Sequence, residues 1–290
     1  MKKGNDGFNY AVLRRKIYEC KEKYPFAGYS VCARSWSGRA LFSLSLGNGK
    51  DPALYMAGVR SGNTAGTRVL LRLFERLCDC VDRRSEVAGI RINEVLCEKG
   101  VIIIPCVNPD GMEVVSSGAI AAGSYAGLVE RVCSDTASWQ ANARGVDLEL
   151  NFSDGFAQTK KIAEGCGYTA PGPYFYAGKV PESEPESRAL VRMCRSRDIR
   201  HSVILRSGAD CLYTPDVSCG TERVEMMCRI LELSSGLGRL REGPGPLDKS
   251  SFAEWFVSTY DRPAFVLNTR DSFEDLYARI EEALVLSLVM

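Results

Sequence analysis

Residues 101–111 read Val-Ile-Ile-Ile-Pro-Cys-Val-Asn-Pro-Asp-Gly, an apolar run that leads directly into a turn. Val101 to Ile104 are all apolar and β-branched, which is typical of a central strand buried on both faces of a sheet. Asn108 to Gly111 has turn chemistry, because asparagine and aspartate bond the local backbone, proline fixes φ and glycine tolerates positive φ. The stretch therefore predicts a buried strand that ends in a tight turn.

Patterns typical of strands and helices alternate on both sides of this stretch. Alternating or fully apolar runs predict strands, and apolar residues spaced three and four apart predict helices. The predicted strands are residues 40–46, 53–59, 202–205 and 264–267. The predicted helices are residues 10–23, 67–81, 183–197, 252–260 and 273–290, with a glycine- and proline-rich loop at 236–245. This alternation favours one α/β domain over residues 1–290, with a mixed or parallel sheet and helices on both faces.

One helix start has a specific signature. Ser183-Glu184-Pro185-Glu186 fits a capping box. In such a box the hydroxyl of Ser183 accepts from the amide of Glu186, and the carboxylate of Glu186 reaches back to the amide of Ser183. We therefore expect these two side chains to satisfy the first turn of the helix.

The overall charge and apolar patterning argue against two classes of partner. Lysine plus arginine (37) nearly balances aspartate plus glutamate (36), for a formal net charge of +1, so nucleic-acid binding has no electrostatic support. No window approaches the roughly 18 uninterrupted apolar residues of a membrane span, and no apolar signal region follows the charged start. We expect a cytoplasmic protein with neither nucleic acid nor membrane as a partner.

The metal-binding residue types are few or badly spaced. The 12 cysteines are scattered through apolar stretches, and Cys78-Asp79-Cys80 is too tight for the usual C-x-x-C zinc knuckle. His201 is the only histidine, and its place before Ser202 to Leu205 predicts a surface residue at a strand entry. Whatever the fold, a metal site with two histidines is excluded by this count.

Five segments with ordinary turn, cap or packing chemistry follow one another along the chain. They are Tyr24-Pro25 with Ser35-Trp36-Ser37-Gly38-Arg39, Asn108 to Gly111, Trp139 to Leu148, Ser183 to Glu186, and Ser250 to Phe256 with Arg262 to Phe265. In this order they resemble motifs of the zinc carboxypeptidases, particularly the bacterial branch that cleaves γ-D-glutamyl-diaminopimelate bonds in cell-wall peptides. The resemblance covers nearly the whole chain. It implies the zinc-carboxypeptidase (phosphorylase/hydrolase-like) α/β fold, with a mixed sheet and helices on both faces.

The resemblance also implies where a zinc site would lie. The family holds zinc with H-x-x-E after an early strand and a histidine at the end of a later strand. Arg60 and Asn63 align with the first histidine and the glutamate, and Arg206 aligns with the second histidine. Guanidinium groups stay protonated and offer no lone pair to a cation. The aligned positions therefore predict a degenerate site with no metal ligands and no cofactor.

The positions that the resemblance assigns to catalysis differ as well. Asn268 aligns with the glutamate that serves the family as general base, and an amide cannot take a proton from water at neutral pH. Glu149 and Leu150 replace the asparagine and the arginine of the clamp that grips the substrate carboxylate. We therefore predict no catalytic residue at these places.

The first hypothesis is a non-catalytic member of the family, a pseudo-peptidase. Its candidate ligand-binding residues are Arg60, Asn63, Arg206, Glu149 and Asp110. Glu149, helped by Asp110, would pair with Arg60 or Arg206, so that an ion pair takes the place of the metal. Such a protein would bind a peptide or a small anion, or regulate an active relative as its protein partner. The alternative is that both arginines are ordinary solvated residues on loops that have drifted.

Two further hypotheses stay open. One is an active hydrolase of cell-wall-type peptides, for which Ser61, Ser207 and Cys211 are the nearby nucleophiles, although no base is evident beside them. The other is a structural or assembly partner that uses the apolar tail at residues 283–290. The same tail is also typical of a last helix packed on the core.

Overall fold

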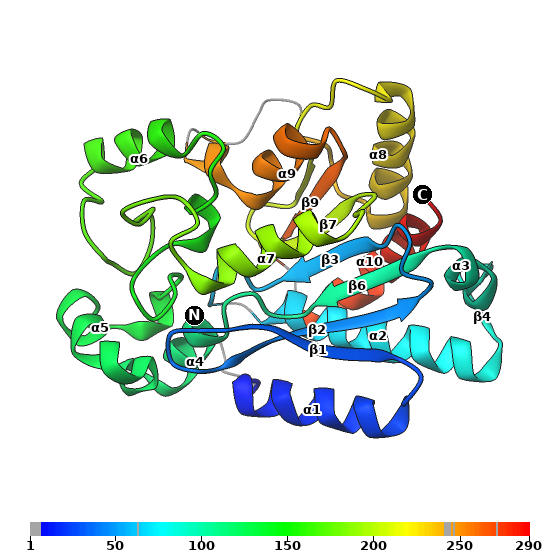
Figure 1. Ribbon diagram of the computed structural model, residues 1–290, viewed down its shortest axis with the longest axis horizontal. Helices are drawn as coiled ribbons and strands as arrows, with labels where there is room; N and C mark the ends of the chain where they lie inside the picture. Colours follow the sequence, from blue (N-terminus) through cyan, green and yellow to red (C-terminus); the bar gives the residue numbers. More distant parts are fainter. Residues whose placement is uncertain (1–6, 63, 241–244, 246, 271) are drawn as a thin grey trace.

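A mixed sheet runs through the middle of the protein (Figure 1). The computed structural model describes residues 7–62, 64–240, 245, 247–270 and 272–290. Among these residues, seven strands form the sheet in the order β1-β2-β6-β3-β7-β9-β8. In chain order they are β1 (Gly28–Arg34), β2 (Ala40–Gly47), β3 (Ala53–Ala57), β6 (Gly100–Ile104), β7 (Ser202–Ser207), β8 (Cys211–Tyr213) and β9 (Ala264–Thr269).

The four central strands are parallel. β6 pairs with β3, β3 with β7 and β7 with β9 in the same direction, whereas β1, β2 and β8 add antiparallel edges. Every residue of β3, β6 and β9 is buried, as expected for strands covered on both faces. The carboxyl ends of β3, β7 and β9 therefore meet at one edge, where open α/β sheets hold their ligands.

Helices cover both faces of this sheet. α7 (Pro185–Ser196) and α9 (Phe252–Tyr260) lie on the face toward the viewer in Figure 1, and α2 (Ala65–Arg83) and α10 (Phe273–Val289) lie on the other. α8 (Thr221–Ser235) packs beside α10. The remaining helices are α1 (Tyr10–Lys23), α3 (Ile92–Glu98), α4 (Pro109–Ser117), α5 (Ala126–Val132) and α6 (Phe156–Gly165), with 3₁₀ turns at Ala119–Tyr125, Thr136–Ser138, Leu148–Leu150 and Asp248–Ser250 and a small hairpin of β4 (Glu86–Val87) and β5 (Ile90–Arg91). The predicted α/β fold, with a mixed sheet and helices on both faces, is confirmed.

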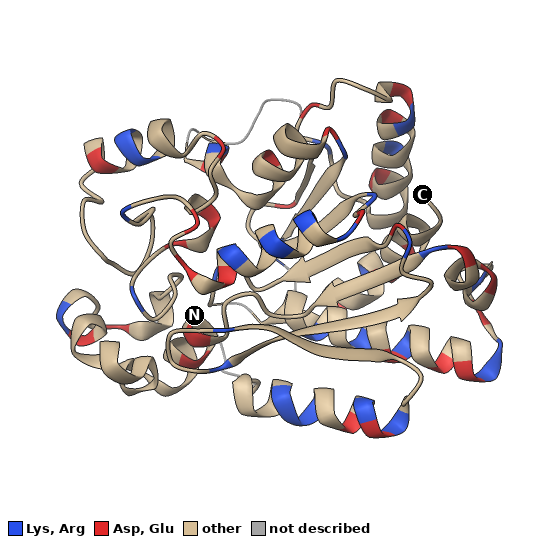
Figure 2. Cartoon of the chain, in the orientation of Figure 1, with Lys and Arg blue, Asp and Glu red and all other residues tan. Residues whose placement is uncertain are grey.

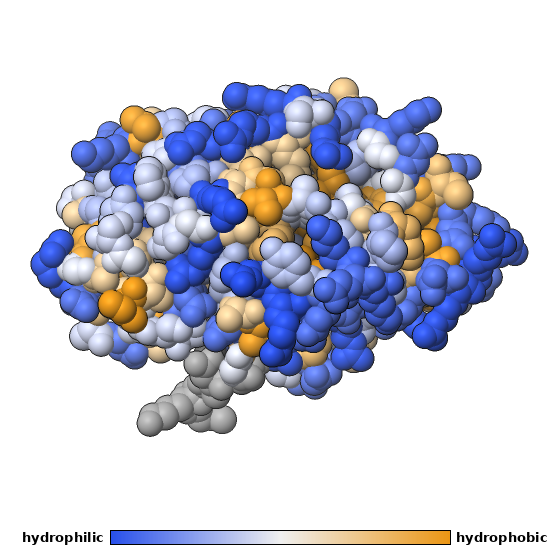
Figure 3. Space-filling model, turned by 60° about the horizontal axis from the view of Figure 1, so that its bottom comes forward, coloured by the Kyte–Doolittle hydropathy of each residue, from blue (hydrophilic) through white to orange (hydrophobic). Residues whose placement is uncertain are grey.

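Charges are placed on the outer surfaces of this framework. Figure 2 shows basic and acidic residues interspersed along α1 and α2, whereas the strands are almost free of charge. Figure 3 shows apolar residues near the middle of one face, with polar residues around them.

No helix in the described part of the chain is long and apolar enough to cross a membrane. All 12 cysteines lie within the described ranges and are free thiols.

The start of α7 differs from the prediction. The Ser183 hydroxyl donates to the carboxylate of Glu184 at 2.8 Å, and no side chain caps the helix. The helix begins at Pro185, whose missing N–H suits a first turn. The predicted capping box is therefore wrong, because the Ser183 hydroxyl bonds the side chain of Glu184 instead of the helix backbone.

A carboxylate network joins four of the segments that resemble family motifs. We define it as Asp110, Glu184 and Glu186, all fully buried, with the groups that bond Asp110 and Glu184. Glu184 accepts from Trp36 Nε1 and Asn142 Nδ2, both at 2.8 Å, and lies 3.5 Å from Arg144 Nη1. The segments at residues 35–39, 108–111, 139–148 and 183–186 therefore meet at shared buried charges.

His201 is also placed differently from the prediction. It directly precedes β7 as expected, but its side chain is buried rather than at the surface. Its ring lies 6.5 Å from that of Tyr55 and 6.2 Å from that of Phe265, centre to centre. The hydroxyl of Tyr55 donates to the Leu284 carbonyl of α10, so the last helix closes this end of the sheet. Burial and nearby cations lower the pKa of His201, which lies at the strand end opposite the ligand edge.

The apolar tail belongs to the core. α10 buries Ala283, Leu284, Val285 and Leu288, while Leu286 is half-buried and Val289 is exposed. Lys99 donates to the Val289 carbonyl at 2.7 Å and Arg200 to the Leu288 carbonyl at 2.7 Å. These contacts support the reading of the tail as a packed last helix.

Candidate ligand-binding site

A cleft opens at the carboxyl edge of the parallel strands. We define it as the cavity of about 510 Å³ whose wall includes Arg60, Glu149, Phe175 and Arg206. Arg60 follows β3 and Arg206 is the last residue but one of β7, so adjacent strands deliver both side chains to the same edge. The two arginines singled out from the sequence therefore line one cavity.

Asp147 fixes Arg60 in this cleft. Both carboxylate oxygens of the fully buried Asp147 lie 3.2 Å from Arg60 Nε. The same carboxylate accepts from the backbone N–H of Glu149 at 3.1 Å and of Phe175 at 3.2 Å. Burial lowers the pKa of Arg60, but the neighbouring charges of Asp147 and Glu149 outweigh it, and the net direction is upward. Arg60 therefore remains a cation in the wall of the cleft.

An aromatic loop forms the wall over Arg60. The guanidinium carbon of Arg60 lies 5.5 Å from the ring centre of Phe175, within the range of a cation–π contact. Phe175 has φ +62°, which is unfavourable for a bulky residue. Its ring packs against those of Tyr168 and Tyr174, and its amide bonds Asp147. These contacts hold the loop in place despite the backbone strain.

Arg206 is held by partners from three segments. Its Nε donates to Asn268 Oδ1 at 2.8 Å, because Arg206 and Asn268 are directly opposite in the β7–β9 register. Its Nη1 lies 3.3 Å from Asp248 Oδ1 and 3.9 Å from Glu149 Oε2. The 3₁₀ turns at Leu148–Leu150 and Asp248–Ser250 present these two acids. Asn268 thus fixes an arginine at the place where the resemblance puts a general base.

Glu149 is almost fully buried, with 3 % of its surface exposed. Its Oε1 accepts no hydrogen bond from any described residue, and Arg60 Nη2 likewise has no acceptor among them. Burial raises the pKa of Glu149, while Arg206 and Arg60 act in the opposite direction. One carboxyl oxygen and one guanidinium nitrogen are therefore left without partners in the wall.

Asp110 does not join this cleft as predicted. Asp110 accepts from Ser35 Oγ and Arg39 Nη1, each at 2.7 Å, and from the amide of Ser37 at 3.0 Å. The predicted help of Asp110 in pairing Arg60 or Arg206 is therefore wrong, because its oxygens are used within the carboxylate network. Asn63 lies outside the described residues.

The two acids that neutralise the arginines most directly, Asp147 and Asp248, were missed from the sequence. Asp147 lies in the segment at residues 139–148, which resembles a family motif, so the resemblance could have pointed to it. Asp248 follows the glycine- and proline-rich loop, and no local pattern separates it from an ordinary loop acid.

The nearby nucleophiles have structural contacts. Ser61 Oγ donates to the Trp139 carbonyl at 2.8 Å, and Cys211 Sγ accepts from Asn268 Nδ2 at 3.4 Å. Ser207 lines the cleft. Nucleophilic catalysis requires an adjacent base. Among the contacts of the described residues, none pairs these three side chains with a base.

The described side chains at this edge do not suit zinc. In the ranges that the structure describes, no three histidine, cysteine, aspartate or glutamate side chains form a group that could hold a metal ion. Arg60 and Arg206 stand at the two positions that the resemblance assigns to histidines, and guanidinium groups are donors without a lone pair.

Comparison with known proteins gives the same family along most of the chain. A family model described as zinc carboxypeptidase matches residues 13–235. Gamma-D-glutamyl-L-diamino acid endopeptidase 1 of Lysinibacillus sphaericus is 20 % identical over 267 residues, covering 91 % of this chain and 66 % of that protein. The catalytic chain of human carboxypeptidase N is 30 % identical over 211 residues, which cover 69 % of this chain and 42 % of its own length. The chain thus spans less than two thirds of each of these two relatives.

Solved structures share the fold. Thrombin activatable fibrinolysis inhibitor superposes with a TM-score of 0.74 at 18 % identity, covering 97 % of this chain and 75 % of that one. Murein-tripeptide amidase MpaA from Escherichia coli O157 superposes with a TM-score of 0.57 at 17 % identity, covering 90 % of both chains. These identities are low, so the structures support the fold alone.

The prediction that this protein has no cofactor must be corrected. The family model that matches most of the chain describes zinc carboxypeptidases, and zinc is therefore the cofactor that the match implies. The prediction was based on three aligned positions, one of which, Asn63, lies outside the described residues.

Proposed function

The chain belongs to the zinc carboxypeptidase family, and we propose that it is a member that binds peptides in its cleft without hydrolysing them. The observation that carries this proposal is the pair Arg60 and Arg206, each fixed by acids in the wall of the cleft. Side chains that are held by surrounding contacts are preorganised for recognition, because a ligand does not have to order them.

The shape of the cleft supports a peptide as ligand. The cavity of about 510 Å³ shares Arg60, Ser61, Ser207 and Thr269 with a neighbouring cavity of about 1040 Å³. The second cavity extends past Phe8 and Phe273. The joined space therefore offers a ligand both charged groups, such as Arg60 and Glu274, and aromatic groups. An extended chain of several residues fits such a space better than a small anion does.

The relatives suggest which peptide to test. The relative from Lysinibacillus sphaericus is named for γ-D-glutamyl bonds to L-diamino acids, and one fold neighbour is named for murein tripeptide. Peptides of the cell-wall type carry free carboxylates, for which arginine is the usual partner. We propose this class of peptide as the ligand of the cleft.

The absence of turnover is proposed from the contacts at the sites of chemistry. Asn268, at the position of the general base, is already bonded to Arg206 and Cys211. An amide does not take a proton from water, so this position supplies no general base. Arg206 itself occupies space at the edge where a family member would hold its reacting water.

Hydrolysis is the second candidate function, and Glu149 favours it. A buried carboxyl group with a raised pKa and an unpartnered oxygen in a cleft is a common arrangement of a general acid or base. In this reading, Glu149 would activate water at a site other than the aligned one. Product analysis separates it from the first candidate.

Calorimetry with a γ-D-glutamyl-diaminopimelate peptide tests the binding proposal. We expect measurable heat with the unaltered protein and a loss of at least about tenfold in affinity for Arg206→Ala, since a charge-assisted hydrogen bond is worth about 1.5–3 kcal/mol. Arg229→Ala is the matched control, because Arg229 is an exposed residue of α8 outside the cleft and its loss should leave the affinity unchanged. Absence of heat with the unaltered protein, or equal effects of both substitutions, would contradict the proposal.

A further inference from the structure

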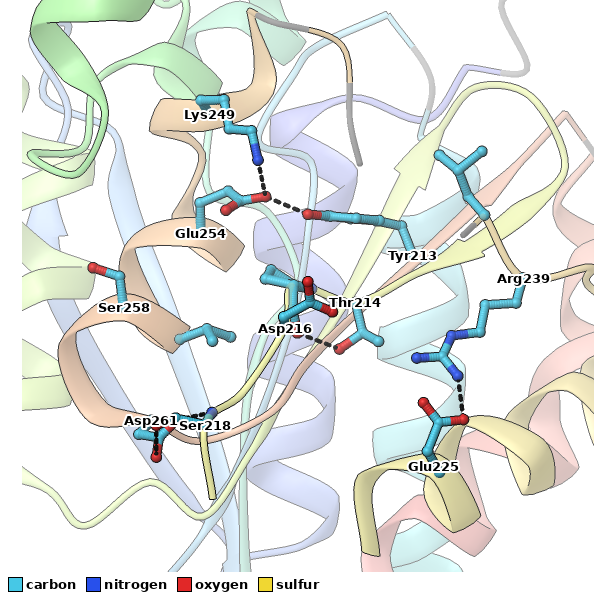
Figure 4. A pocket seen from close by; sticks show the side chains of 13 residues that line it. Tyr213, Thr214, Asp216, Ser218, Glu225, Arg239, Lys249, Glu254, Ser258 and Asp261 are labelled. Atoms are coloured by element: carbon cyan, nitrogen blue, oxygen red, sulfur yellow. Dashed lines mark hydrogen bonds and ion pairs between the residues drawn. The ribbon is translucent and has the colours of Figure 1, made fainter. Parts of the chain in front are cut away.

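Two cavities of similar volume differ in how their charged groups are satisfied. The cavity in Figure 4, of about 520 Å³, lies beside β8 and α9. There Glu254 accepts from Tyr213 and lies 3.9 Å from Lys249, and Arg239 Nη1 lies 2.6 Å from Glu225. These groups point toward one another. In the ligand-binding cleft, by contrast, Glu149 and Arg60 each keep a buried atom without a partner among the described residues.

Acids already neutralise the cations of the ligand-binding cleft. Its two cations, Arg60 and Arg206, contact three acids, which are Asp147, Glu149 and Asp248. A ligand that brings only negative charge would have to compete with carboxylates that are in place. A ligand that suits this wall should therefore bring a positive group as well.

The unpartnered atoms specify what the ligand presents. Arg60 Nη2 is a donor and needs an acceptor, such as a carboxylate oxygen. Glu149 Oε1 needs a donor when the carboxyl group is ionised. Both are buried side-chain atoms, and buried polar atoms normally have partners, so a ligand that supplies both partners completes the wall.

We infer that the cleft recognises the zwitterionic end of its peptide, with a carboxylate oxygen on Arg60 Nη2 and an ammonium group on Glu149 Oε1. This rests on the proposed function and specifies its ligand class. The ammonium and carboxylate groups need to lie close together, as they do on a single amino-acid carbon, because Arg60 and Glu149 line the same cavity and both bond the Asp147 carboxylate. A peptide with the carboxylate alone leaves Glu149 unpartnered and binds more weakly.

The test compares two peptides that differ by one charge. The first is γ-D-glutamyl-diaminopimelate with its distal amine free, and the second is the same peptide acetylated at that amine. We expect the free amine to bind at least about tenfold more tightly to the unaltered protein, as judged from calorimetric dissociation constants. In Glu149→Gln the ratio of the two dissociation constants should fall close to one. Glu254→Gln, in the cavity of Figure 4, should keep it.

The outcomes separate this inference from the function on which it rests. Equal affinity of the unaltered protein for both peptides overturns the inference and leaves peptide binding standing. A preference that persists in Glu149→Gln overturns the assignment of Glu149. Binding of neither peptide overturns the proposed function and this inference with it. If Glu149→Gln fails to fold, the affinities of the unaltered protein for the free and the acetylated peptide decide whether the inference holds.

Discussion

The carboxylate network and the ligand-binding cleft are both built from buried or half-buried charges, but they differ in what those charges contact. In the network, Asp110 and Glu184 bond side chains or amides from segments that resemble family motifs. In the cleft, Arg60 and Arg206 stand at the ends of adjacent parallel strands and contact acids. Residues of the motif-like segments thus hold those segments together, whereas in the cleft Arg60 and Glu149 each keep a buried polar atom without a partner among the described residues.

Removal of the Glu184 carboxylate should give the largest effect. In Glu184→Ala, Trp36 Nε1 and Asn142 Nδ2 lose their acceptor and Arg144 loses its ion pair. We expect a loss of about 3–5 kcal/mol in the free energy of unfolding, as is usual when one partner of a buried charged contact is removed. Urea denaturation followed by circular dichroism measures it. A loss below about 1 kcal/mol would show that the network does not hold these segments together.

The network also predicts a pH dependence of stability. Burial raises the pKa of Glu186 to about 8, and neither carboxyl oxygen has a hydrogen-bond partner among the described residues. The folded protein thus keeps a proton that the unfolded chain releases near pH 4.5. The contribution of Glu186 to the free energy of unfolding is therefore complete below pH 4.5 and is lost as the pH rises to about 8.

Glu186→Gln should remove this slope. We expect a difference on the order of 3–4 kcal/mol between the two proteins in how much stability is lost from pH 5 to pH 8, measured as urea midpoints across that range. His201 acts in the opposite direction, because burial lowers its pKa and stability is lost as the pH falls below about 6.5. The comparison with Glu186→Gln cancels this contribution. Identical slopes would contradict the burial of an unpaired Glu186.

Asp147 tests whether the cleft depends on its own buried carboxylate. Asp147→Asn keeps the shape but turns an NH₂ group toward donors that now bond Asp147, namely Arg60 Nε and the amides of Glu149 and Phe175. We expect a loss of about 2 kcal/mol in stability and about tenfold in peptide affinity, because Arg60 is released. Calorimetry and urea denaturation measure the two effects. Unchanged affinity would separate Arg60 from ligand binding.

The smallest effect is expected at the aromatic wall. Phe175→Gly relieves the positive φ, worth roughly 1–2 kcal/mol, but loses the ring contact with Arg60 and the packing on Tyr168 and Tyr174. The opposing terms should leave stability within about 1 kcal/mol of the unaltered protein, while peptide affinity falls a few-fold. Tyr18→Ala, an exposed aromatic on α1, is the control and should leave affinity unchanged.

Local sequence signals predicted the helices and strands well where caps or apolar runs lie within the element or next to it. α1 and α9 have the expected bounds, and the side chains of Asn9 and Ser251 cap them. The apolar run at Val101 to Ile104 forms a fully buried strand. These signals lie within a few residues of the element that they define, so they can be read from the sequence.

The features that the sequence did not reveal depend on residues far apart in the chain. Arg60 bonds Asp147, which is 87 residues away in the sequence, and Arg206 bonds Asp248, which is 42 residues away. His201 looked exposed because nothing near it indicates that α10 closes that end of the sheet. The aligned positions nevertheless directed attention to Arg60, Arg206 and Glu149, because the strand ends that deliver Arg60 and Arg206 were recognisable from local pattern.

Product analysis of the cell-wall-type peptide tests the central claim most directly. The protein is incubated with γ-D-glutamyl-diaminopimelate peptide, with and without added zinc, and the peptide is followed by chromatography while calorimetry reports its binding. We expect the peptide to be bound and to be recovered intact under both conditions. Cleavage that depends on the added protein, and above all cleavage that a chelator abolishes, would contradict it.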